Sequence, residues 1–130
     1  MNVISTFSEG CRGEWNLIDA RDTVHLLHVL GHLYGSHGQV KRGVAYLLIA
    51  IQLAPGDSGI LRTLAHLLIL DGEADKALVT IERLETMEDT ARHPALALLK
   101  SRALALAGRT EEARNSFREF LAEQENETRA

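Results

Sequence analysis

Three histidines stand at helical spacing in the stretch "DTVHLLHVLGHLYG": His25, His28 and His32. Positions i, i+3 and i+7 fall on one side of a helix. Imidazole is a common metal ligand, and His28 and His32 have the i, i+4 spacing of a chelating pair. A structural zinc ion takes four protein ligands, however, and no carboxylate or thiolate is adjacent to this pair in the sequence. The alternative is a polar face that binds a partner, and we expect no metal.

Two other patterns that could carry chemistry have simpler interpretations. "GQVKRGV", residues 38–44, contains the two glycines of a phosphate-binding loop, but Val44 and Ala45 stand where that loop requires Lys and Ser or Thr. We interpret it as a turn between helices. The Ser, His and Asp residues form no nucleophile-elbow sequence. The sequence therefore predicts a protein that is not an enzyme, with no catalytic residue and no cofactor.

These residues must be positioned by the helices around them, and three similar turns mark where those helices end: "HGQVKRG", "DGEADKA" and "AGRTEEA". Their glycines are Gly38, Gly72 and Gly108, separated by 34 and 36 residues. A glycine placed directly after a helix adopts a left-handed conformation at little cost. Five positions after each glycine stands a small residue, which we expect where two antiparallel helices cross closely: Gly43, Ala77 and Ala113.

Between the turns, leucines recur at spacings of three and four, which indicates helices and not strands. A helix–turn–helix unit of about 34 residues is typical of tetratricopeptide repeats. Units that start at Val24, Ser58 and Pro94 follow that pattern, although Leu27 replaces its Trp and Asp89 its closing Pro. The sequence predicts an all-α fold of three such repeats stacked as a short right-handed solenoid. The expected helices cover residues 24–37, 40–53, 58–71, 74–87, 94–107 and 110–124.

The chain divides into three parts around this repeat. Residues 1–23 are expected to be partly disordered or to add a short capping helix. Residues 24–125 form the repeat domain, and residues 126–130 an acidic tail that frays. Within the domain, the helix from Gly43 to Ala54 carries Gln52 as its one strongly polar side chain. Either residues 1–23 cover this apolar helix or it is a surface for a partner or for self-association.

Composition limits the function further. The chain has 130 residues, of which 45% are apolar, enough for one domain with a core. A formal charge of −4 and an aromatic content of 5% argue against nucleic-acid binding. Cys11 is the only cysteine, so no internal disulfide forms, and neither a signal peptide nor an apolar run of about 20 residues is visible. We expect a cytoplasmic protein that does not insert into membranes.

The repeat register places one set of side chains on the concave face of the predicted solenoid. These are the second, fifth and ninth positions of the first helix of each unit. Helical-repeat proteins use such extended concave surfaces for binding. We expect a cradle for a peptide or helix, with Ile69 adding apolar contact, formed by His25, His28, His32, Arg62, His66, Leu98 and Arg102.

With this register fixed, the chain resembles the cytosolic chaperones of bacterial type III secretion, most closely the YscY type. The resemblance rests on "GHLYGSHGQVKRGVAYLLIAIQLAPGD" in the first unit and "LLKSRALALAGRTEEARNSFREFLAEQ" in the last. It implies a chaperone that binds a small exported partner of the YscX type, a pair needed for secretion of early substrates at the export apparatus of the inner membrane. Two alternatives remain open: a chaperone of needle or translocator subunits, or a self-associating scaffold without a secreted client.

Overall fold

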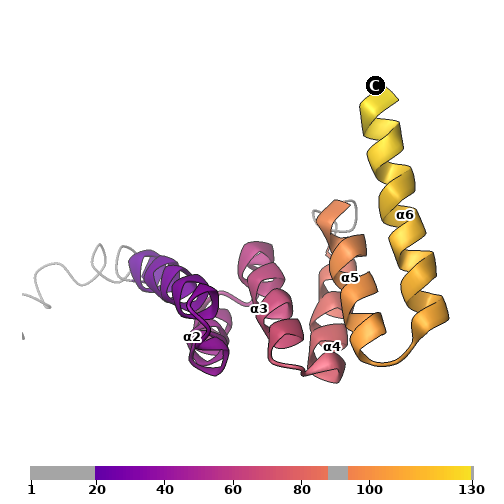
Figure 1. Ribbon diagram of the computed structural model, residues 1–130. Helices are drawn as coiled ribbons and strands as arrows, with labels where there is room; N and C mark the ends of the chain where they lie inside the picture. Colours follow the sequence, from indigo (N-terminus) through magenta and orange to yellow (C-terminus); the bar gives the residue numbers. More distant parts are fainter. Residues whose placement is uncertain (1–19, 88–93, 130) are drawn as a thin grey trace, which may run out of the picture.

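The structure of the protein, a computed structural model, describes residues 20–87 and 94–129, which form helices joined by short turns. The all-α prediction is confirmed over this part of the chain. Figure 1 shows the helices side by side in chain order, from the indigo first helix to the yellow last one. The helices are residues 20–36, α2 Val40–Leu53, α3 Ser58–Leu70, α4 Ala74–Glu85, α5 Pro94–Leu106 and α6 Thr110–Arg129.

Helix bounds follow the prediction closely except at the two ends. The 20–36 helix is already present at Ala20, four residues before the predicted start, so residues 20–23 belong to it and not to a separate lead. The rest of the predicted lead, residues 1–19 with Cys11, lies outside the described residues. At the other end, α6 continues to Arg129 through most of the tail that was expected to fray. Its Glu, Gln and Arg residues are good helix formers, which explains the extension.

The three glycine turns have the same backbone geometry. Gly38, Gly72 and Gly108 have φ values of 84°, 80° and 82°, in the left-handed region that favours glycine. In each turn, the amide that follows the glycine donates to a carbonyl five residues earlier, which ends the preceding helix in a Schellman motif. The three bonds are each 2.9 Å long and join Gln39 to Tyr34, Glu73 to Leu68 and Arg109 to Leu104.

The small residues that follow these turns are all buried where helices cross. Ala77 is 0% exposed and Ala113 is 5% exposed. At Gly43 even a methyl group has no room. A Cβ there would lie 2.7 Å from the Gly31 carbonyl oxygen and 2.9 Å from Leu67 Cδ1. The backbones of the 20–36 helix and α2 therefore approach too closely for any side chain at this position.

Packing follows chain order. α2 contacts α3, α3 contacts α4, α4 contacts α5 and α5 contacts α6, around a core that runs along the row. α3 also approaches α5 directly, whereas α2, α4 and α6 make no such approach to one another within the described ranges. No helix in 20–87 or 94–129 combines the length and the apolar character needed to span a bilayer. The largest fully buried side chains are Leu47, Ile60, Leu61, Ile81 and Leu84.

Candidate functional site: the His/Arg face

The residues predicted to form a binding face come from the first helix of each pair. We call this surface the His/Arg face: His25, His28 and His32 of the 20–36 helix, Arg62 and His66 of α3, and Leu98 and Arg102 of α5.

Two side-chain contacts connect the three helices of the His/Arg face. His28 Nε2 lies 2.9 Å from Thr63 Oγ1, which connects the 20–36 helix to α3. Arg102 Nη1 lies 3.3 Å from His66 Nδ1, which connects α5 to α3. A guanidinium only donates hydrogen bonds, so His66 Nδ1 is the acceptor and its ring carries no proton there. Of the predicted residues, His66 and Arg102 contact each other, whereas His28 contacts Thr63, which was not predicted.

Burial and neighbouring charge act together on two of the histidines. Burial lowers the pKa of His28 below its ordinary value of 6.5, and His32, His25 and Arg62 lower it further, while the Asp57 carboxylate opposes the shift. Burial likewise lowers the pKa of His66, followed by the charges of Arg102 and His32. Both rings are consequently neutral at pH 7 and serve as hydrogen-bonding groups.

Arg62 and Arg102 give the His/Arg face a permanent positive charge. Within the described part of the chain, neither Arg62 nor Arg102 forms an ion pair with a carboxylate. Other cations do form such pairs: Lys100 Nζ lies 3.0 Å from Glu85 Oε1, and Arg114 Nη1 lies 2.9 Å from Glu111 Oε1. Arg62 is also partly buried. Among the described residues, the His/Arg face thus offers two guanidinium groups that are not ion-paired.

One residue assigned to this surface lies elsewhere. Ile69 is 9% exposed and belongs to the hydrophobic core, so it offers no apolar contact to a partner. Ile69 is not at a second, fifth or ninth position of its unit, and α3 turns its side chain inward. Leu98, by contrast, is partly exposed and remains the apolar residue of the His/Arg face.

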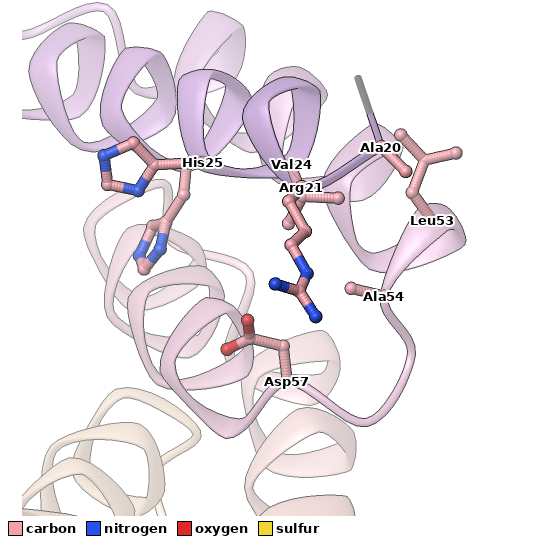
Figure 2. Close-up of a pocket in the computed structure, with 8 residues that line it drawn as sticks. Ala20, Arg21, Val24, His25, Leu53, Ala54 and Asp57 are labelled. Atoms are coloured by element: carbon pink, nitrogen blue, oxygen red, sulfur yellow. The ribbon is translucent and has the colours of Figure 1, made fainter. Parts of the chain in front are cut away.

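A pocket of about 360 Å³ opens at the N-terminal end of the His/Arg face, beside His25 and His28. Figure 2 shows the Arg21 side chain extending across it toward the Asp57 carboxylate. Asp57 Oδ1 also accepts a hydrogen bond of 3.2 Å from the amide of Ile60 and so caps α3. The pocket continues the His/Arg face toward the end of α2 at Leu53 and Ala54.

Sequence reasoning missed Arg21 and Asp57. Arg21 stood in the segment taken as a lead, and Asp57 in a linker. The signal that would have found Asp57 was present, because an Asp directly before the helix that starts at Ser58 is a typical N-cap.

The His/Arg face carries groups that can bind a partner. His28 Nε2 already contacts Thr63 Oγ1, and no three His, Cys, Asp or Glu side chains gather as a possible metal site in the described residues. The surface presents guanidinium charge, neutral imidazoles and one leucine. In comparisons with known proteins, no family model matches this chain and no curated protein matches it.

Proposed function

We propose that this protein is a cytoplasmic chaperone of bacterial type III secretion, of the YscY type, built as three tetratricopeptide repeats in a right-handed solenoid. The sequence resemblance in the first and last units suggests the class. The three equal turns at Gly38, Gly72 and Gly108 support the repeat. The proposal assigns binding to the protein and no catalysis.

The packing pattern supports a concave binding surface. α3 and α5, which carry part of the His/Arg face, approach each other directly, whereas the second helices of the pairs do not. When the helices lie closer together along one side of the row than along the other, the row curves toward that side. The His/Arg face then lies on the inside of the curve, where helical-repeat proteins bind their partners.

One observation carries the choice of client: Arg62 and Arg102 have no carboxylate partner in the described residues. A buried or partly buried cation is stabilised by an opposite charge, and charge complementarity selects partners. We infer a client segment with an apolar stripe edged by Asp or Glu, in which apolar side chains meet Leu98 and carboxylates meet the arginines. For a small exported partner of the YscX type, covering such a stripe would prevent premature aggregation.

The test is a double substitution, Leu98→Glu with Arg102→Glu, in the full chain. We expect co-expressed YscX-type partner to co-purify with the wild type and the affinity of the variant to fall by about 100-fold, because the surface becomes anionic. The matched control is Leu121→Glu with Arg118→Glu, the same exchange on exposed positions of α6. Circular dichroism verifies that both variants fold.

Three outcomes would contradict parts of this proposal. If the folded Leu98→Glu, Arg102→Glu variant binds the partner with wild-type affinity, the His/Arg face is not the site. If wild type retains needle or translocator subunits instead of the YscX-type partner in the same co-expression, the client class is different. A stable homodimer that retains none of them indicates a scaffold.

A further inference from the structure

Away from the His/Arg face, two hollows occupy equivalent places in successive repeats. The first seam, between α2, α3 and α4, has a volume of about 410 Å³. The second seam, between α4, α5 and α6, has a volume of about 290 Å³. Their linings correspond residue by residue at the repeat spacing: Leu48 with Glu82, Leu64 with Lys100, and Glu73 with Arg109. The two seams can therefore be compared directly.

Most of the charged side chains that line the second seam form ion pairs with one another. Lys100 Nζ lies 3.0 Å from Glu85 Oε1 across the junction of α5 with α4. Arg109 donates two hydrogen bonds to Glu112, of 3.1 Å and 2.6 Å, in a bidentate arrangement. Charged groups that are paired and partly exposed are stable in contact with water. Glu85, Lys100, Arg109 and Glu112 of the second seam are therefore paired within the fold, whereas Glu82 forms no ion pair among the described residues.

At the positions of Glu82 and Lys100, the first seam has Leu48 and Leu64. Leu64 and Leu68 form a buried floor. The walls are open to solvent: Leu48 is 48% exposed and Val79 is 65% exposed, the highest value among the large apolar side chains of the described residues. An apolar hollow with open apolar walls is the usual form of a site that receives a partner's side chain.

The rim of the first seam is acidic. It carries Asp71, Glu73 and Asp75, against one cation, Lys76, whose Nζ lies 4.0 Å from Glu73. Asp75 in the first turn of α4 complements the helix dipole, but Asp71 is the C-cap of α3, where the dipole disfavours a negative charge. Asp71 makes no ion pair within the described part of the chain. The fold therefore does not account for the whole acidic rim.

We propose that the first seam is a second docking site, for a partner segment that inserts one large apolar side chain between Leu48 and Val79 and places Lys or Arg against Asp71, Glu73 and Asp75. The partner is basic where the client of the His/Arg face is acidic, so the two surfaces select different segments. α6 of a second copy fits poorly, because its exposed Phe117 and Leu121 lie on a helix whose sequence has six Glu and three Arg.

The experiment uses two synthetic amphipathic helices of equal length, one of Leu and Lys and one of Leu and Glu, with the full chain. We expect calorimetry to show the Leu/Lys peptide binding about tenfold more tightly than the Leu/Glu peptide. The methyl resonances of Leu48, Leu64 and Val79 should shift in NMR spectra on addition of the Leu/Lys peptide.

The decisive variants are Val79→Lys and Leu48→Lys, which place a cation at the mouth of the first seam; Val79 also lines the second seam, whereas Leu48 lines only the first of the two. Because Val79 is 65% exposed and Leu48 is 48% exposed, each change leaves folding intact, and we expect binding of the Leu/Lys peptide to weaken about tenfold. Val29→Lys is the matched control: Val29 is 47% exposed on the 20–36 helix, and its replacement should leave binding unchanged. Leu98→Glu with Arg102→Glu should also retain the peptide, which separates this site from the proposed function.

Three results would overturn the proposal: no binding of the Leu/Lys peptide, equal binding of both peptides, or equal weakening by Val79→Lys and Val29→Lys. The last outcome would mean that the peptide associates with the acidic protein as a whole and not with the first seam.

Discussion

The first and second helix pairs share a turn but differ in how their helices cross. In the first pair, Gly31 and Gly43 bring two backbones together, and a methyl group at Gly43 would meet the Gly31 carbonyl oxygen at 2.7 Å. At the corresponding places the second pair has Ala65 and Ala77, both 0% exposed. The same left-handed glycine therefore reverses the chain without setting the distance between the helices. That distance depends on the small residues at the crossing.

The largest expected effect comes from overfilling the crossings that use alanine. Ala77→Leu should lower the free energy of unfolding by about 3 kcal/mol, because α3 and α5 enclose α4 from two sides. Ala113→Leu should cost about 1 kcal/mol, because α6 has α5 as its only neighbouring helix among those described and can shift outward. Urea unfolding measures both. Unchanged stability in the two variants would show that these positions are not the crossings.

Gly43→Ala tests the first crossing directly. Alanine is a better helix former than glycine by about 1 kcal/mol, so the substitution would stabilise an ordinary helix. Here we expect a net loss of about 2 kcal/mol, because the added methyl meets backbone that cannot move aside. Ala77→Gly is the reciprocal control and should also destabilise. A Gly43→Ala protein that melts at a higher temperature than wild type would contradict the close approach.

Substitution of the glycine in each of the three turns should lower the stability by a similar amount. An added Cβ at Gly38, Gly72 or Gly108 would meet nothing within 4 Å, so only the backbone conformation penalises a side chain. Substitution of each by Ala should cost about 1 kcal/mol. Thermal unfolding of the three single variants provides the comparison. A cost at one turn well above the other two would mean that the turns are not equivalent.

The smallest effect concerns the two histidines that bridge neighbouring pairs, His28 and His66. Their pKa values are lowered in the folded protein, so below pH 6.5 the unfolded chain binds more protons than the folded one. The free energy of unfolding should therefore be highest above pH 6.5 and fall as the pH decreases through the two folded pKa values. Unfolding measured between pH 7.5 and pH 5 in His28→Gln, His66→Gln protein should show a weaker decrease. Leu26→Gln, exposed on the same helix as His28, is the control that removes no titrating group.

Much of the fold was predictable because its signals are local. Each signal lies within a few residues of the sequence: the glycine after each first helix, the apolar spacing of three to four, and the Asp or Pro near helix starts. The helix bounds that these signals predicted for α2, Val40–Leu53, agree with the structure at both ends. The end of α6 was missed because residues 121–129 are exposed and mostly polar or charged, a pattern that is also typical of a fraying tail.

The binding surfaces were harder to predict, since they depend on several helices at once. The structure brings the predicted His66 and Arg102 into contact, but it buries Ile69, which was predicted to add apolar contact. The first seam was not predicted, because Leu48, Leu64 and Val79 come from three different helices. Aligning the repeats would have revealed it, since Lys100 stands in the third unit where Leu64 stands in the second.

Packing in chain order has a consequence for how the protein folds. When each helix rests mainly on its neighbours in sequence, few contacts require distant parts of the chain to meet, and such helical proteins fold within microseconds to milliseconds. Assembly can also proceed from one end during synthesis. All residues of the first seam, together with His28, Arg62 and His66, precede the end of α4 at Glu85. A nascent chain could thus present the first seam and most of the His/Arg face while α5 and α6 are still being translated.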